Sequence, residues 1–180
     1  SGVLTNAPTL VSGAIYTIKF NGQDAVGNES IQVNVTNIEY VKAFAPDNKE
    51  DLMDAVEEWI NEGDEDIYNK VPIEDWDVSL ITDMSFLFQN ADSFNDDIND
   101  WNVSNVTNMQ YMFYNAKSFN QPIGSWDTSE VINMQSMFYK AVEFNQNINT
   151  PDDDSTWDVS NVTNMFHMFE KAYKFNGDIS

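Results

Sequence analysis

A column of acidic and amide side chains recurs along the chain, and these residue types hold metal ions and peptide groups. Each member directly follows a tryptophan: Asp77, Asn102, Asp127 and Asp158. Asp100, just before the second of these tryptophans, adds another carboxylate. Stacked carboxylates repel one another, so a cation or a donor-rich ligand would lower the cost of keeping them together. We predict a ligand-binding face from these residues, with helix capping or simple exposure to water as the alternative.

An insertion at residues 149–156 offers oxygen atoms at short spacing. Asp152 and Asp154 lie there among other polar residues, and Ca²⁺ prefers several carboxylate and carbonyl oxygens as ligands. The spacing is not that of an EF-hand loop, and a solvated acidic loop is the alternative. We predict a calcium site that uses Asp127, Asp152, Asp154 and Asp158.

Two further side chains stand at positions that vary between repeats, and we predict that they line a ligand groove. They are Tyr111 and His167, the only histidine in a chain without cysteine. Neither a zinc site nor a catalytic triad can be assembled from this set. Paired carboxylates could serve a glycan hydrolase if they lay about 5–10 Å apart in a cleft, but nothing else supports that chemistry. We predict that the protein is not an enzyme.

The elements that position these residues come from an internal repeat. Trp76, Trp101 and Trp126 are 25 residues apart, and Trp157 follows after 31, so that copy carries six extra residues. Each tryptophan heads a similar string, as in WNVSNVTNMQYMFYNAKSFN. Periods of about 20–50 residues are typical of solenoids, in which each unit buries its apolar face against its neighbours.

The second unit shows the structure that we expect in every repeat. Ser104 is a good helix cap, and the apolar residues after it have helical spacing. These residues are Val106, Met109, Met112, Phe113 and Ala116. Trp101 and Val103 alternate with Asn102, which predicts a very short strand. Parallel pairing of such strands, about 4.8 Å apart, predicts an α/β solenoid of leucine-rich-repeat type.

Two other columns are predicted to be structural. Aromatic rings bury a large apolar area, so the tryptophans are assigned to the core rather than to sugar binding. The same assignment holds for Phe94, Phe119, Phe144 and Phe175. An asparagine follows each of these phenylalanines, at Asn95, Asn120, Asn145 and Asn176. Stacked asparagines can satisfy backbone groups at turns, which predicts an asparagine ladder.

The chain before the repeats divides into two predicted parts. Residues 1–40 hold two β-rich runs around a Gly/Asn turn, which predicts a short β-hairpin. Residues 47–62 have apolar positions at helical spacing, with Asp47 or Asn48 as the cap, and predict a helix that covers the open end of the repeats. We therefore predict a β-rich segment over 1–40 and a capped solenoid over 41–180, with repeats starting at 76, 101, 126 and 157.

Charge limits the class of partner. The formal net charge is −22, from 30 acidic and 8 basic residues, which disfavours nucleic acid and anionic membranes as partners. No apolar run is long enough to cross a membrane, and no signal peptide is recognisable. We predict a monomeric module of a larger protein, with no nucleic-acid binding and no membrane insertion.

The amino-acid sequence also resembles those of known protein families. The segment FAPDNKEDLMDAVEEWINEG and the repeats after it, together residues 44–180, resemble the BspA-like leucine-rich-repeat surface proteins of bacteria. The stretch YTIKFNGQDAVGNESIQVNV resembles the last strands of bacterial immunoglobulin-like modules. With the acidic charge, these features are similar to the peptide-binding domain of calcium-dependent RTX adhesins. The resemblance implies a secreted protein at the bacterial cell surface that requires Ca²⁺ and binds extended peptide or protein ends.

Residues and resemblance together lead to one expected function. It is calcium-dependent binding of an extended peptide, by its C-terminal carboxylate, on a protein of another cell surface. Ca²⁺ held by protein carboxylates would bridge to a ligand carboxylate that the acidic face otherwise repels. The alternative function is a structural spacer or self-association module of a surface protein.

Overall fold

The computed structural model describes residues 44–62, 71–148 and 157–177. The chain divides into two compact units, Ser1–Lys42 and Ala43–Ser180. All described residues belong to the second unit, so the hairpin predicted within residues 1–40 lies outside them. Among the described residues, no helix is long and apolar enough to cross a membrane.

The predicted helix before the repeats is confirmed as α1, Lys49–Glu62. Asn48 is its cap, because the backbone N–H of Asp51 donates to Asn48 Oδ1 at 3.0 Å. One side of the helix is buried in the common core, through Leu52, Ala55 and Val56. The helix therefore begins at a side-chain cap and is held by the burial of one apolar side.

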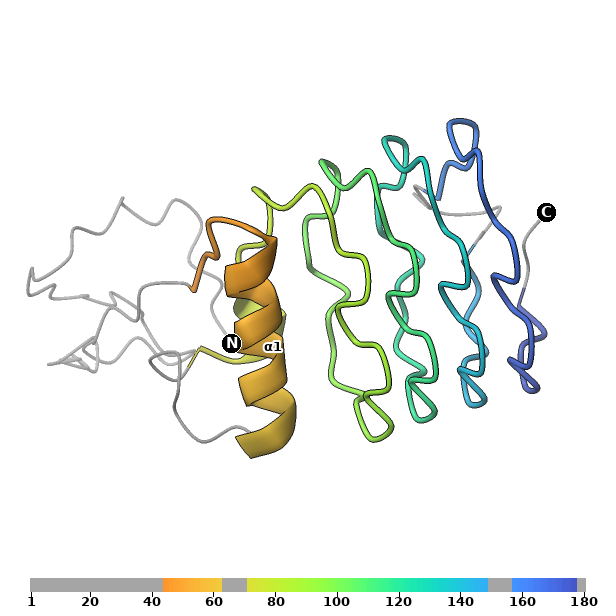
Figure 1. Ribbon diagram of the computed structural model, residues 1–180, viewed down its shortest axis with the longest axis horizontal. Helices are drawn as coiled ribbons and strands as arrows, with labels where there is room; N and C mark the ends of the chain where they lie inside the picture. Colours follow the sequence, from red (N-terminus) through yellow and green to blue (C-terminus); the bar gives the residue numbers. More distant parts are fainter. Residues whose placement is uncertain (1–43, 63–70, 149–156, 178–180) are drawn as a thin grey trace, which may run out of the picture. The chain divides into compact units, whose positions relative to one another are not determined.

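Four coils follow α1 and lie side by side in the order of the sequence (Figure 1). We number them first to fourth, starting at Trp76, Trp101, Trp126 and Trp157. The short 3-10 helix η1, Ile73–Asp75, precedes the first coil. Parallel β-bridges join successive coils, at Asp83↔Asn108, Asn108↔Asn133 and Asn133↔Asn164.

Backbone N–H groups of alternate residues point from each coil to the next. In the second coil the donors are Met109, Tyr111, Phe113 and Asn115, and their acceptors in the third coil lie 2.7–2.9 Å away. The acceptors are the carbonyl groups of Asn133, Gln135, Met137 and Tyr139. The same pattern of four bonds joins the first coil to the second and the third coil to the fourth. These donors are therefore not available for bonds four residues back, which an α-helix needs.

The short helix predicted after Ser104 is wrong, because the structure has successive turns there. Tyr111 and Asn115 each have φ of 58°, in the left-handed region. The backbone N–H of Met112 bonds three residues back, to the carbonyl of Met109 at 3.2 Å. Left-handed residues interrupt a right-handed helix. The turns still bury the apolar residues whose spacing had suggested a helix.

The strand predicted at Trp101–Val103 is also wrong. These residues have no ladder partner, and the β-bridges fall at Asn108 and its equivalents instead. The chain turns on both sides of the segment, since Trp101 N–H bonds to the Ile98 carbonyl at 3.2 Å and Val106 N–H to the Val103 carbonyl at 2.8 Å. These turns confine the segment to Trp101, Asn102 and Val103, and no β-bridge forms there among the described residues.

The tryptophan column is confirmed as core. The first three tryptophans are at most 3 % exposed, and Trp157 is half-buried. Each indole N–H is satisfied by a backbone carbonyl, as in Trp126 Nε1 to Ile98 O at 3.1 Å and Trp101 Nε1 to Ile73 O at 2.8 Å. Buried indoles need such partners.

The phenylalanine column forms a stacked ladder, which confirms its assignment to the core. Phe119 stacks on Phe94 and on Phe144 with ring centroids 6.0 Å apart in both pairs. A second ladder of buried phenylalanines runs beside it, and Phe113 stacks on Phe138 at 5.5 Å. Offset stacking adds roughly 0.5–1.5 kcal/mol per pair to the free energy gained by burial.

The asparagine ladder is confirmed as well. The backbone N–H of Asn120 donates to Asn95 Oδ1 at 2.8 Å, and that of Asn145 donates to Asn120 Oδ1 at 2.8 Å. Asn176 repeats the bond on Asn145 at 2.7 Å. Each asparagine thus satisfies a backbone donor of the next coil.

Side-chain bonds hold α1 against the first coil. Lys49 Nζ lies 3.2 Å from Asp83 Oδ1 and also donates to Ser85. Trp59 Nε1 donates to Asp96 Oδ2 at 2.8 Å. Asp83 takes the place that asparagine holds in the other three coils. A carboxylate suits that place because its partner is a lysine of the helix, whereas Asn133 bonds to Gln110 of the preceding coil.

We expect the asparagine ladder to carry measurable stability. Asn120→Ala leaves the backbone N–H of Asn145 without its acceptor and should lower the free energy of unfolding by about 1–2 kcal/mol. Asn120→Asp keeps the acceptor oxygens and should stay within about 0.5 kcal/mol of the parent protein. Denaturant unfolding at moderate ionic strength measures both. Equal losses in the two variants would contradict a hydrogen-bonded ladder.

The bond between α1 and the first coil should weaken in acid. Burial raises the pKa of Asp83, but hydrogen bonds from Ser85 and Lys49 and the lysine charge outweigh burial and hold the pKa below 3.8. A carboxyl whose pKa is lowered by folding stabilises the folded state at pH values above its ordinary pKa. This stabilisation is lost as the pH falls through the pKa of the folded state. The advantage of the parent over Asp83→Asn should therefore be full above pH 3.8 and decline below it, disappearing only as the pH falls through the lowered pKa of the folded state.

Urea unfolding of both proteins across acid pH checks this sign. Asp100→Asn is the matched control, because this carboxylate is exposed. The difference in unfolding free energy between the parent and this variant should not change with pH in the way expected for Asp83→Asn. A gap between the parent and Asp83→Asn that is independent of pH would contradict the role given to the carboxylate.

Candidate functional site

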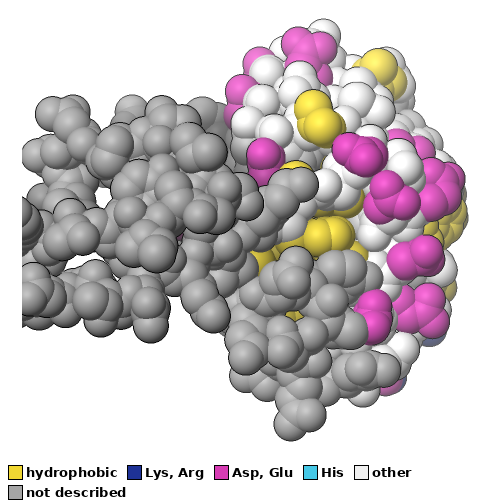
Figure 2. Space-filling view, turned by 90° about the vertical axis from the view of Figure 1, so that its left-hand side faces the viewer, with side chains coloured by type: hydrophobic (Ala, Val, Ile, Leu, Met, Phe, Trp, Pro, Cys, Tyr) yellow, Lys and Arg dark blue, Asp and Glu magenta, His cyan; other side chains and the backbone are white. Residues whose placement is uncertain are grey.

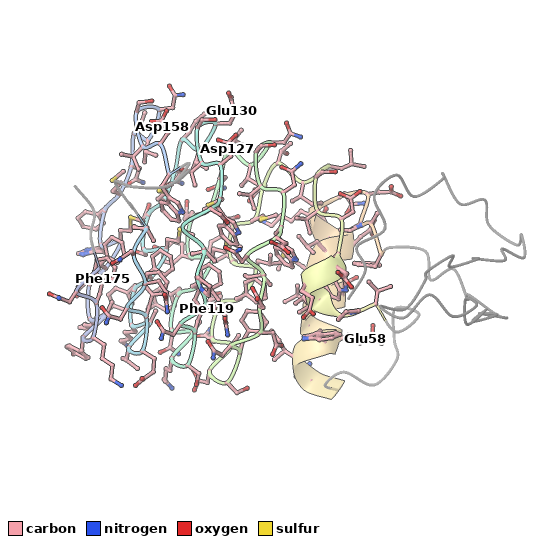
Figure 3. All side chains as sticks on the ribbon, turned by 180° about the vertical axis from the view of Figure 1, so that it is seen from behind. Glu58, Phe119, Asp127, Glu130, Asp158 and Phe175 are labelled. Carbon is pink, nitrogen blue, oxygen red and sulfur yellow. The ribbon has the colours of Figure 1, made fainter. Side chains whose placement is uncertain are left out.

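The residues of the predicted acidic face lie at one corner of the coils, where each one closes a tight turn. Figure 3 shows Asp127 and Asp158 side by side at this corner, near Glu130. The Oδ1 atom of every member accepts the backbone N–H of the serine two residues later, at 2.8–3.2 Å. The pairs are Asp77–Ser79, Asn102–Ser104, Asp127–Ser129 and Asp158–Ser160. This geometry favours the capping alternative, with a turn in place of the expected helix.

Two pKa values agree with this structural role. Hydrogen bonds from the Ser79 side chain and backbone lower the pKa of Asp77. Bonds from the Ser160 backbone and side chain lower the pKa of Asp158. Both carboxylates are therefore charged at neutral pH, with one oxygen already used by their own turn. Asp100, the remaining residue predicted for this face, is exposed.

The described residues hold no cluster of metal-binding side chains. No group of three His, Cys, Asp or Glu side chains in this part of the chain could hold a metal ion. Asp127 and Asp158 each give Oδ1 to a serine N–H. Asp152 and Asp154 lie outside the described residues. Calcium binding by the insertion therefore stays a prediction.

A different set of side chains forms an outward row across the coils, which we call the aromatic strip: Phe86, Tyr111, Tyr114, Tyr139 and His167. Phe86 stacks on Tyr111 with centroids 5.1 Å apart, and Tyr114 stacks on Tyr139 at 4.8 Å. Tyr111 contacts Tyr114 within the second coil at 5.4 Å. All five side chains are exposed or half-buried. The strip brings together Tyr111 and His167, the two residues predicted to line a groove.

Left-handed turns place these side chains on the surface. Phe86, Tyr111 and His167 have φ of 68°, 58° and 60°. In the second coil, Met109 before this position and Met112 after it are fully buried. The left-handed position thus carries an aromatic or imidazole side chain at the surface in the first, second and fourth coils, whereas Ser136 of the third coil is left-handed but buried.

Lysines gather at this strip although the chain is strongly acidic. Lys171 Nζ donates to Tyr139 Oη at 2.7 Å and lies 5.0 Å from the ring centroid. Lys140 Nζ lies 5.5 Å from the same ring. The bond to Tyr139, followed by the bond to Glu170, raises the pKa of Lys171 above 10.5. His167 faces Glu170 as an ion pair when it is protonated. The fourth-coil end of the strip thus offers positive charge beside an aromatic ring.

Sequence reasoning missed Tyr114, Tyr139, Lys140 and Lys171. They occupy two adjacent positions of the repeat, and Lys140 and Lys171 are themselves left-handed, with φ of 60° and 63°. The available signal was the return of aromatic and basic residues at these positions in successive repeats. In a helix, residues three and four apart share a face, so the predicted helix would also have placed these positions beside those of Tyr111 and His167. The signal was therefore present in the sequence.

Two grooves beside α1 include acidic side chains. A groove of about 460 Å³ beside α1 is lined by Trp59, Glu74, Asp96 and Asp97, among others. A second groove, of about 330 Å³, lies between α1 and the first coil and includes Glu57. Figure 2 shows Asp and Glu side chains spread over the described part of the face seen there. Neither groove offers a described lysine to an anionic ligand.

The corner turn can be tested at Asp127. Asp127→Asn keeps the Oδ1 acceptor, as Asn102 does naturally, and we expect a free energy of unfolding within about 0.5 kcal/mol of the parent. Asp127→Ala removes the acceptor and should cost about 0.5–1.5 kcal/mol. Thermal and denaturant unfolding of the two variants compare them. A larger loss in the Asn variant would show that the charge itself is needed at this corner.

Comparison with protein families places most of the chain in a family. Residues 59–180 match the family described as "Mycoplasma protein of unknown function, DUF285". The match begins within α1 and includes all four coils. No curated protein and no solved structure matches the chain. Because the match spans more than half of the sequence, the chain belongs to the family described as "Mycoplasma protein of unknown function, DUF285".

Proposed function

We propose that the protein is a peptide-binding module that holds an extended peptide along the aromatic strip, with the peptide's C-terminal carboxylate beside Lys140 and Lys171. The observation that carries this proposal is the gathering of lysines around Tyr139 in a chain with a net charge of −22. A carboxylate is repelled by most of this surface. Beside these lysines it is attracted.

The dimensions of the strip suit a short extended ligand. Three steps between coils span about 14 Å, which is the length of about four residues of extended peptide. Tyr111, Tyr114 and Tyr139 offer ring faces and edges to the ligand's side chains, and large rigid aromatic side chains contribute strongly to binding. Gln135 Nε2 donates to Tyr111 Oη at 3.0 Å, which fixes one of these rings in place.

Two further expectations belong to the same proposal. The first is a location on a bacterial cell surface, with a protein of another surface as the partner. The second is a leucine-rich-repeat-type solenoid as the class of this stack of coils, in a protein that is not an enzyme. The calcium requirement stays a prediction that concerns Asp152 and Asp154, and no step of the proposed binding passes through a metal ion.

A structural spacer is the second candidate, and one observation favours it. The asparagine and aspartate side chains that recur along the coils already accept backbone hydrogen bonds within the stack, in the asparagine ladder and in the corner turns. A spacer would use the coils only for length and stiffness. It would bind no peptide at the aromatic strip, so the same experiment separates the two functions.

Charge removal at the strip tests the proposal. The probes are fluorescently labelled pentapeptides of mixed aromatic and aliphatic sequence, each made with a free and with an amidated C-terminus, and anisotropy measures their affinity. The double variant Lys140→Met with Lys171→Met keeps most of the side-chain length and removes both charges. We expect it to weaken binding of the free-acid peptides by about tenfold, equivalent to about 1.4 kcal/mol, and to leave the amides unchanged.

The matched control changes two lysines that form ion pairs elsewhere. Lys117 pairs with Asp92 and Lys174 with Glu143, and their double change to methionine should not affect the preference for the free acid. Equal affinity for acids and amides in the parent would contradict the carboxylate site. Failure of every peptide to bind would favour the spacer. Titrations repeated in EDTA show whether calcium takes part.

A further inference from the structure

We infer that the outer face of the fourth coil is a docking surface for one further coil of the same repeat, and not for an ordinary β-strand or a second copy of this protein. The fourth coil lies at the end of the stack away from α1 (Figure 1). This inference is independent of the aromatic strip and goes beyond the proposed function.

Apolar side chains of the fourth coil are exposed where their equivalents are buried. Met165 is 40 % exposed, whereas Met109 and Met134 are fully buried. Val159 is 47 % exposed, and the equivalent Val103 is 1 % exposed. The burial that each inner coil receives from its successor is therefore missing here. Exposed apolar area of this kind is typical of an interaction surface.

Backbone donors of the fourth coil are also left over. At each inner junction four N–H groups donate to the next coil. The equivalent groups of the fourth coil are those of Met165, His167, Phe169 and Lys171. None of them has a backbone acceptor among the residues that the structure describes. Unpaired backbone donors that lose water on docking must find acceptors, because a buried donor without a partner costs free energy.

The order of these groups selects the partner. The four N–H groups from Met165 to Lys171 follow one another along the edge of the fourth coil with no carbonyl acceptor between them. An acceptor comes only before them, at the carbonyl of Thr163. Its equivalent in the third coil, the carbonyl of Ile132, accepts a bond from the fourth coil. The edge of an ordinary strand alternates donors with acceptors, so its own N–H groups would face some of the four donors. A coil with left-handed turns presents four carbonyls on one side, as Asn164, Phe166, Met168 and Glu170 do toward the third coil.

A second copy of this chain does not supply such a face. Two fourth coils placed together would set donors against donors. The matching carbonyl side of the first coil is the side that α1 covers, held there by Lys49 and Trp59. The partner is therefore a polypeptide segment with the repeat sequence and no helix over its carbonyl side.

Fusion of a fifth coil tests the inference in the full chain. A copy of residues 125–148 attached after Ser180 keeps the spacing of 25 residues between successive tryptophans. The control carries the same copy with valine in place of the residues that correspond to Ser136 and Lys140, since β-branched residues disfavour positive φ. The measurement is hydrogen exchange at the four backbone amides of Met165, His167, Phe169 and Lys171.

We expect these amides to exchange about tenfold more slowly, or slower still, in the fusion than in the parent. The valine control should exchange like the parent. Unchanged exchange in the fusion would overturn the inference. Equal protection of the four amides in the valine control would also overturn it, because the added segment would then protect them without its left-handed turns. Sedimentation of the parent provides a second test. A dimer in which these four amides are protected would show that a second copy is the occupant.

Discussion

Backbone N–H groups that point from one coil to the next are the interaction on which the rest of this structure depends. Four such groups in each inner coil reach carbonyls of the following coil at 2.7–3.0 Å. They set the distance between coils, and that distance lets the phenylalanine rings stack and the asparagines reach the next backbone. The core and the polar ladders are therefore consequences of a single backbone pattern, repeated at each junction.

This pattern requires residues in the left-handed region, and it has a cost. Eight described residues other than glycine have positive φ, and each such residue costs roughly 1–2 kcal/mol relative to the right-handed region. The hydrogen bonds between coils and the buried rings offset this cost. The same conformation places Tyr111, Lys140 and His167 on the surface. The face that combines stacked rings with lysines thus arises from the geometry that holds the coils together.

Part of this could be predicted from the sequence, because a buried column needs an apolar residue at the same place in every repeat. The tryptophans, the phenylalanines and the asparagine ladder followed from that rule, and α1 followed from helical spacing and Asn48. The apolar spacing after Ser104, however, fits a helix and a pair of left-handed turns equally well. No glycine marks Tyr111 or Asn115 as left-handed, so the usual signal was missing.

The candidate site was predicted only in part. Tyr111 and His167 were found from their variation between repeats. Lys140 and Lys171 were overlooked, although their positions, four residues further along the repeat, would share a face with Tyr111 and His167 in a helix as well. The acidic column was assigned to a binding face because its side chains were expected to leave a strand freely. In the structure Asp127 and its equivalents accept a hydrogen bond from their own turn.

Nuclear Overhauser contacts in the second coil test the central claim most directly. The structure predicts contacts between the backbones of Tyr111 and Gln135, which are bonded across coils at 2.9 Å, together with positive φ at Tyr111 and Asn115. A continuous series of contacts between residues four apart over 106–116, without contacts to the third coil, would show a helix and contradict the account.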